Sequence, residues 1–217
     1  MSKINTVLID FDGTLMDTNE LIMNSWQHTF RVLRGKEEDP ERIKKTFGEI
    51  LDISVREFFP EVEPEEAVEV YRSYQLNYFS DDIHLFPGMM ELIKKLKAAG
   101  YKVAVVTSRL RPTTMEGLEK FGLEKILDDI ITVEDCSKHK PDPEPALVAM
   151  RRLGSKPEET LMIGDSRYDM ACANRAGATS VLVDWAVALF DRAKEGDFKP
   201  DYVLEKPEKL WDILDEA

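Results

Sequence analysis

Short runs of branched apolar residues alternate with segments of helical period through most of the chain. After Phe86, such runs occupy residues 103–106, 130–133, 161–163 and 181–183. The helical segments that accompany them span residues 89–99, 113–121, 144–153 and 168–176. Strands that are apolar throughout and are joined by helices are typical of a parallel sheet covered on both faces. The sequence therefore predicts an α/β fold with a Rossmann-like parallel sheet, whose ligands lie beyond the carboxyl ends of the strands.

A long helical insertion separates the first strand from the others. The first apolar run is Val7-Leu8-Ile9, and no convincing strand follows it before Phe86. Thr18 is a candidate N-cap for one helix, and Pro64 a candidate first residue for another. We therefore expect residues 17–84 to form an all-helical cap and residues 1–16 and 85–217 to form the α/β core.

Composition excludes several classes of protein. The 217 residues contain 29 Lys and Arg against 42 Asp and Glu, a formal net charge of −13, which disfavours a nucleic-acid partner. Two cysteines, Cys136 and Cys172, form neither a disulfide framework nor a zinc-ligand pattern. No run approaches the roughly 18 apolar residues that span a bilayer, and Met1 to Asn5 does not begin a signal peptide. We expect a cytoplasmic protein without a membrane partner, as a monomer or weak homodimer.

Two carboxylates lie close together where the first strand ends. The sequence Asp10-Phe11-Asp12-Gly13-Thr14 follows the strand, and Gly13 allows the loop to curl and expose backbone N–H groups. One carboxylate there can attack phosphorus to form an aspartyl phosphate. The second can protonate the leaving oxygen and later accept a proton from water. For an isolated Asp-Gly pair, an ordinary turn is the commoner interpretation.

Three later loops carry groups that suit phosphate chemistry. Thr107, followed by Ser108, ends the run 103–106, where a hydroxyl and a backbone N–H can bind a phosphoryl oxygen. Lys140 lies in a proline-stiffened loop and can offset negative charge. Asp165 follows the run 161–163 and suits Mg²⁺ as a hard oxygen ligand, while Asp169 can orient it or a bound water. Taken singly, each of these residues also fits a helix cap or a solvated loop.

The four motifs together resemble those of the haloacid dehalogenase-like (HAD) phosphohydrolases of subfamily I, and residues 17–84 resemble their helical C1 cap. The resemblance implies a Mg²⁺-dependent phosphohydrolase that acts through an aspartyl phosphate on a small phosphorylated metabolite or inorganic pyrophosphate. It implies catalytic roles for Asp10 as nucleophile, Asp12 as acid/base, Thr107 and Lys140. Phosphate binding falls to Gly13, Thr107, Ser108 and Lys140. It implies that the metal is bound by Asp10, by the backbone carbonyl of Asp12 and by Asp165, and that Asp169 orients these ligands without binding the metal directly.

Finer resemblances narrow the branch of the family. Asp12 distinguishes the chain from true dehalogenases and from the phosphonate-cleaving branch, which carry other residues there. Segments 18–22, 28–29, 140–145 and 199–202 resemble HAD-type inorganic pyrophosphatases, with phosphoglycolate phosphatases close behind. Ser108-Arg109 departs from the Thr-Lys pair expected at this place in the pyrophosphatases.

Other functions stay open at this point. A β-phosphoglucomutase-like mutase shares all four motifs. Outside enzymes, a receiver-like phospho-accepting switch also uses an aspartate, Mg²⁺ and a lysine, although the cap and Asp12 argue against it. A binding protein that has lost catalysis is a third alternative, disfavoured by the complete set of motif residues.

Overall fold

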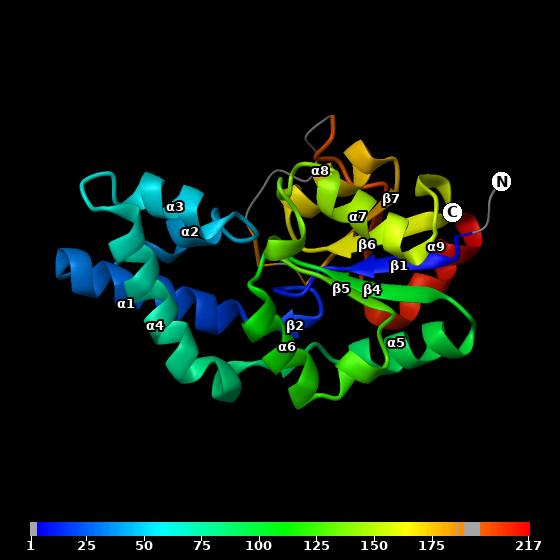
Figure 1. Ribbon diagram of the computed structural model, residues 1–217, viewed down its shortest axis with the longest axis horizontal. Coiled ribbons are helices and arrows are strands. Elements are labelled where there is room, and N and C mark those ends of the chain that lie inside the picture. Colours follow the sequence, from blue (N-terminus) through cyan, green and yellow to red (C-terminus); the bar gives the residue numbers. More distant parts are fainter. Residues whose placement is uncertain (1–3, 186, 189–195) are drawn as a thin grey trace.

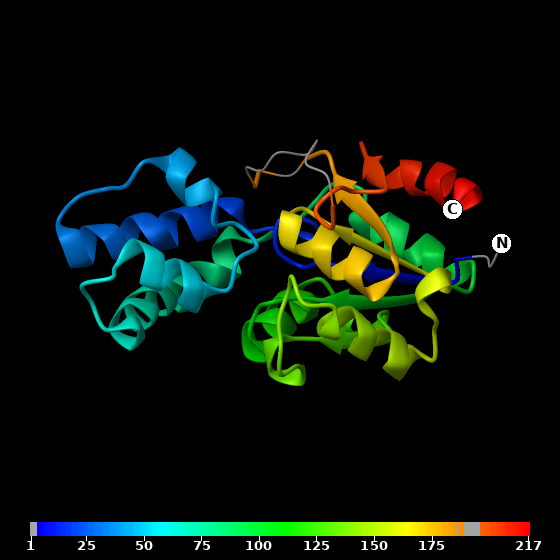
Figure 2. The ribbon, with the colours of Figure 1, turned by 90° about the horizontal axis from the view of Figure 1, so that it is seen from above.

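The computed structural model describes residues 4–185, 187–188 and 196–217. A six-stranded sheet forms one lobe, and helices from residues 17–84 form a second lobe at one end of it (Figures 1 and 2). The sheet has the strand order β5-β4-β1-β6-β7-β8, and every neighbouring pair is parallel. Its strands are β1 (Thr6–Ile9), β4 (Lys102–Val106), β5 (Asp129–Ile131), β6 (Thr160–Gly164), β7 (Thr179–Val183) and β8 (Tyr202–Leu204). This arrangement confirms the predicted parallel α/β fold.

Successive strand residues point to opposite faces of the sheet. Because both sets of side chains are apolar, helices cover both faces. Val7 and Ile9 of β1 belong to one buried apolar cluster, and Leu8 between them belongs to another. The first cluster includes residues of α5 (Met89–Ala98), α6 (Arg111–Lys120) and α9 (Leu210–Glu216). The second includes residues of α7 (Glu144–Leu153) and α8 (Arg167–Ala176). Short 3₁₀ turns complete the core lobe: η1 (Leu123–Lys125), η2 (Val133–Asp135), η3 (Pro157–Glu159) and η4 (Pro207–Lys209).

One strand is shorter than its apolar run. We expected a strand over 130–133, but β5 ends at Ile131 and Val133 begins η2. Thr132 and Asp135 form a capping box. The Asp135 carboxylate accepts hydrogen bonds from the backbone N–H and from the hydroxyl of Thr132. This local hydrogen bonding turns the chain out of the sheet and overrides the β propensity of Val133.

The second lobe has an apolar core of its own. It contains α1 (Asn19–Arg34), α2 (Pro40–Lys44), α3 (Leu51–Phe58) and α4 (Pro64–Asp82). Trp26 and Phe30 of α1 pack edge-on against Phe58, and Tyr71 of α4 closes the cluster. Among the described residues, no helix combines the length and the apolar character needed to cross a bilayer.

The chain enters and leaves this lobe through two paired strands. β2 (Met16–Asp17) and β3 (His84–Leu85) form an antiparallel pair that the sequence did not predict, because two-residue strands have no detectable period. Thr18 directly precedes α1 as expected, but its hydroxyl makes no capping bond. It donates instead to Asp12 Oδ1 at 2.7 Å, and so connects the linker to the loop after β1.

Candidate functional site

The loops that carry the predicted site residues meet where the strand order reverses. β1 is followed along the chain by β4 and β5 on one side, and later by β6 on the other. Loops that diverge at such a point leave a crevice beyond the carboxyl ends of the strands. Asp10, Thr107 and Asp165 directly follow β1, β4 and β6, and Lys140 reaches the same crevice from the loop after η2. The β1 arrow in Figure 1 points toward the helical lobe, which therefore covers this edge of the sheet.

A buried ammonium joins three elements at the centre of the site. Lys140 Nζ donates to Asp10 Oδ1 and to Asp169 Oδ1, both at 2.6 Å, and to the carbonyl oxygen of Val106 at 2.7 Å. The lysine side chain is 3% exposed. An ammonium has three N–H donors, so each of them has a partner here. Burial disfavours the charged lysine, but the two carboxylates raise its pKa above its usual value.

Three carboxylates gather around this lysine. Asp10, Asp165 and Asp169 are all buried, and each offers an oxygen within 4.8 Å of the others. Burial first, and then the charge of Asp169, raise the pKa of Asp10 to about 8, although Lys140 opposes the shift. The same causes raise the pKa of Asp165 well above its usual value. A single lysine leaves this cluster short of positive charge, so its hard oxygens fit a divalent cation such as Mg²⁺.

Two glycines allow these carboxylates to approach the backbone. Gly13 has φ +73°, and a Cβ there would lie 2.2 Å from Asp165 Oδ2. A Cβ on Gly164 would lie 2.2 Å from the Cβ of Asp169. Asp169 Oδ2 also accepts from the backbone N–H and the hydroxyl of Ser166, which caps α8. Asp169 therefore fixes Lys140 and the start of α8 at the same time.

Asp12 lies apart from this cluster and is held by a different cation. Arg109 Nη2 donates to Asp12 Oδ1 at 2.8 Å, and its Nε donates to Oδ2 at 3.0 Å. The guanidinium lies 4.9 Å from the ring centroid of Phe79 and 5.7 Å from that of Phe11. Sequence reasoning gave Arg109 no role, although the departure at Ser108-Arg109 marked the position.

Thr107 presents a hydroxyl at the end of β4. Its backbone N–H donates to the Ile131 carbonyl at 2.9 Å, and its Oγ1 accepts from the Arg109 backbone N–H at 3.1 Å. The hydroxyl proton therefore stays available to a ligand. Ser108 is half-buried beside it and lines the same cavity.

A cavity of about 450 Å³ lies between the two lobes, within the range of small-molecule sites. Its core side includes Asp10, Asp12, Thr107, Ser108, Arg109, Lys140 and Asp169. Its cap side includes Trp26, residues 46–52, Tyr71, Arg72 and Gln75. The cavity thus joins the predicted core residues to cap side chains that sequence periodicity did not identify.

A loop of the cap rests directly on the loop after β6. Tyr168 donates its hydroxyl proton to Glu49 Oε1 at 2.7 Å, and Arg167 donates to the Tyr168 hydroxyl at the same distance. Gly48 has φ +80°, and a Cβ there would lie 2.5 Å from Ser166 Oγ. Only glycine allows so close an approach, and the contact closes one side of the cavity.

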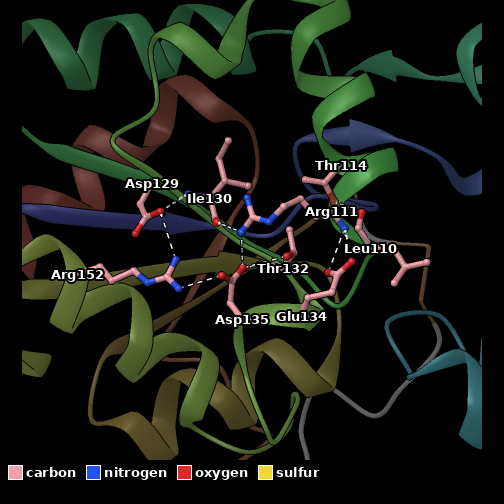
Figure 3. A network of polar contacts seen from close by, with 9 residues as sticks. All are labelled: Leu110, Arg111, Thr114, Asp129, Ile130, Thr132, Glu134, Asp135 and Arg152. Atoms are coloured by element: carbon pink, nitrogen blue, oxygen red, sulfur yellow. Dashed lines mark hydrogen bonds and ion pairs between the residues drawn. The ribbon is translucent and has the colours of Figure 1, made fainter.

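A polar network outside the cavity fixes two of the site loops (Figure 3). Glu134 accepts from the Arg111 backbone N–H at 3.0 Å, and Asp135 pairs with the Arg111 and Arg152 guanidinium groups. Burial works against ionisation of Asp135, but hydrogen bonds from Thr132, Arg152 and Arg111 hold its pKa at about 2. The network ties the segment after Thr107 to the segment that leads to Lys140.

Comparisons with known proteins give a family match and relatives over nearly the whole chain. A model of the haloacid dehalogenase-like hydrolase family matches residues 7–183. The pyrophosphatase PpaX of Halalkalibacterium halodurans is 38% identical over 98% of this chain and 97% of its own length. The pyrophosphatase PpaX of Bacillus mycoides is 36% identical over 98% of this chain and 97% of its own length. The crystal structure of a predicted phosphatase from Clostridium acetobutylicum superimposes with a TM-score of 0.85 at 26% identity, covering 100% of both chains.

The network around Asp135 generates a prediction about acid stability. A carboxylate whose pKa falls from about 3.9 in the unfolded chain to about 2 in the folded one stabilises the protein above pH 4. This contribution is lost as the pH falls through 2. We expect Asp135→Asn to lower the free energy of unfolding by about 2 kcal/mol at pH 7 and by about half as much at pH 3. Urea unfolding at pH 7 and at pH 3 measures this, with the exposed Asp212→Asn as control. An equal loss of unfolding free energy at the two pH values would contradict the prediction.

The contact of Gly48 with Ser166 generates a second prediction. Gly48→Ala and Gly35→Ala both place a Cβ at positive φ, which costs about 1 kcal/mol each. Only the Gly48 variant meets another residue, since nothing lies within 4 Å of a Cβ at Gly35. We expect Gly48→Ala to be the less stable variant in urea and to show a larger radius of gyration by X-ray scattering. Equal stability and equal size of the two variants would show that the loop does not hold the lobes together.

Proposed function

The chain belongs to the haloacid dehalogenase-like hydrolase family, and we propose that it is a Mg²⁺-dependent phosphohydrolase in which Asp10 becomes phosphorylated. The observation that supports this most is the placement of Asp10. Its carboxylate lies at the end of β1, held by a buried lysine at 2.6 Å and close to Asp165. A carboxylate fixed in this way, at the open edge of a parallel sheet, is placed to act as a nucleophile.

Asp10 and Asp165 would hold the Mg²⁺, together with the backbone carbonyl of Asp12. The donor set fits, because the carboxylates are hard oxygen ligands within reach of one another and lack sufficient positive charge. Asp169, whose oxygens are already engaged by Lys140 and Ser166, would orient the site from behind. When bound, Mg²⁺ supplies Lewis-acid polarisation of the phosphoryl group and neutralises part of its charge.

The protein groups divide the reaction between them. Asp10 attacks phosphorus in line as the bond from phosphorus to the leaving oxygen breaks. Lys140 fixes the Asp10 carboxylate, and the Thr107 hydroxyl, the neighbouring Ser108 and the N–H groups of the loop at Gly13 bind the phosphoryl oxygens. Asp12 gives a proton to the leaving oxygen, then takes one from the water that hydrolyses the aspartyl phosphate.

Residues 17–84 act in this proposal as the cap, and residues 1–16 and 85–217 as the catalytic core. The paired strands β2 and β3 lie at the two boundaries. The contact of Glu49 with Tyr168 closes the cap over the cavity. A closed cap keeps bulk water from the phosphorylated aspartate and leaves room only for a small substrate.

Inorganic pyrophosphate is the substrate that we propose first. Relatives with 38% and 36% identity over nearly the whole chain are pyrophosphatases. We expect Mg²⁺-dependent phosphate release from pyrophosphate to exceed that from 2-phosphoglycolate at matched concentrations. Asp10→Asn should abolish both activities, because an amide cannot serve as the nucleophile, while its circular dichroism and unfolding transition stay those of a folded protein. Phosphate release by the purified Asp10→Asn variant would contradict the mechanism, whereas a preference for phosphoglycolate would change only the substrate.

The metal assignment is tested without turnover. We expect 10 mM Mg²⁺ to raise the melting temperature of the wild-type protein by about 3–6 °C, since binding to the folded state alone adds about 1–2 kcal/mol. Asp165→Asn should raise the melting temperature in EDTA, because it removes one of the crowded buried carboxylates. The same variant should lose the response to Mg²⁺, and the exposed cavity-rim variant Asp52→Asn should keep it. An undiminished Mg²⁺ response in Asp165→Asn would contradict the assignment. Differential scanning calorimetry measures all three proteins.

A further inference from the structure

Arg109 is a buried cation in the cavity to which the reaction scheme assigns no task. Its side chain is 7% exposed and lines the cavity beside Asp12. Nε and Nη2 are used by the Asp12 carboxylate, but Nη1 has no hydrogen-bond partner in the described part of the chain. Lys140 differs in this respect, because all three of its N–H donors are engaged. Of the two buried cations Lys140 and Arg109, it is therefore Arg109 that has N–H donors left for a ligand.

The position of Arg109 follows from its contact with Asp12. An acid that protonates a leaving oxygen must lie within hydrogen-bond reach of that oxygen. A guanidinium in bidentate contact with the same carboxylate therefore lies beside the leaving group and not beside the transferring phosphoryl group. Both Asp12 oxygens are occupied by Arg109, and Oδ1 also accepts from Thr18. For Asp12 to act on the leaving oxygen, at least one of these contacts has to be released.

We propose that Arg109 selects substrates whose leaving group carries a second anionic group, either phosphate or carboxylate. When such a substrate binds, the guanidinium exchanges Asp12 for this second group, and the released Asp12 carboxylate takes up a proton from solvent and turns to the leaving oxygen, to which it gives that proton as the bond from phosphorus breaks. The inference rests on the proposed function, because the acid/base role of Asp12 defines the leaving-group side. Pyrophosphate and 2-phosphoglycolate both meet the requirement, and phenyl phosphate does not.

The surroundings of Arg109 suit such an exchange. A planar guanidinium presents paired N–H donors that match a phosphate or carboxylate as they match Asp12. The faces of Phe79 and Phe11 hold the guanidinium in place whichever anion it binds. Burial strengthens the contact, because water competes little for the donors. Arg72, which lines the cavity from the cap, is solvent-exposed and lacks these constraints.

The test compares three substrates in one variant. We expect Arg109→Gln to lower kcat/KM for pyrophosphate and for 2-phosphoglycolate by about 30-fold more than for phenyl phosphate. Phenyl phosphate accounts for general damage to folding, which would affect all three substrates alike. Damage to the acid role of Asp12 would instead follow the basicity of the leaving oxygen, and would weaken turnover of 2-phosphoglycolate, whose leaving group is an alkoxide, more than turnover of pyrophosphate. A loss confined to pyrophosphate identifies phosphate as the group recognised, whereas a loss confined to 2-phosphoglycolate, the pattern expected of a damaged acid, would overturn the proposal. Arg109→Lys, which keeps the charge without the planar fork, should recover only part of the difference.

Arg111→Gln is the matched control. Arg111 lies two residues further on and is paired with Asp135 (Figure 3). It is not among the residues that line the cavity. The same substitution there loosens the loops that Arg111 holds and so affects all three substrates alike, and the ratio between substrates should stay unchanged. An equal loss for all three substrates in Arg109→Gln, or an equal change of the ratio in Arg111→Gln, would overturn the proposal.

A binding measurement separates this proposal from the proposed function. In the Asp10→Asn background with Mg²⁺, calorimetry compares pyrophosphate with orthophosphate, and adding Arg109→Gln should reduce the preference for pyrophosphate by about 30-fold. If the wild-type protein hydrolyses none of the three substrates and this preference still falls, the proposed function fails and the anion site stands. If hydrolysis is normal and the preference is unchanged, the Arg109 proposal alone fails. Arg109→Lys in the same background serves if the glutamine variant does not fold.

Discussion

The buried ammonium of Lys140 is the interaction on which the site depends. It joins the loop after β1, the last carbonyl of β4 and the first turn of α8 through three short hydrogen bonds. A buried lysine without anionic partners would be strongly unfavourable, and buried carboxylates without a cation equally so. Each of these groups therefore requires the others, and the requirement brings together loops that are far apart in the sequence. Gly13 and Gly164 follow from the same crowding, because a side chain at either place would collide with an aspartate.

The sequence predicted most of the core lobe for a simple physical reason. Strands buried on both faces consist of uninterrupted apolar residues, so the runs at 103–106, 161–163 and 181–183 coincide with strands in the structure. Residues that directly follow such strands must lie at one edge of a parallel sheet, and this alone predicts that Asp10, Thr107 and Asp165 lie near one another. The failure at Val133 has a local cause, since the capping box of Thr132 and Asp135 ends the strand early.

The remainder of the site depends on contacts that no periodicity encodes. Arg109 reaches Asp12 across 97 positions of sequence, and Tyr168 reaches Glu49 across 119. Each of these residues, considered alone, is an ordinary polar residue of a loop or helix end. The contact of Tyr168 with Glu49 is determined by how the two lobes dock against each other, whereas Arg109 meets Asp12 inside the core lobe, where the loops after β1 and β4 converge. The helical lobe also helps to set the direction of the Asp12 side chain. Thr18 of the linker donates to Asp12, and Phe79 of the cap packs against the guanidinium of Arg109.

The antiparallel pairing of β2 with β3 brings the two ends of the helical insertion side by side, with Asp17 opposite His84. An insertion whose ends are adjacent places no demand on the order or spacing of the strands in the sheet. A different domain with equally close termini could replace the helices at this point while the β1 loop, Lys140 and Asp165 keep their places. The scaffold thus separates two evolutionary problems: the groups that we propose to act on phosphate are inherited with the sheet, and the opposite wall of the cavity changes when the inserted module is exchanged.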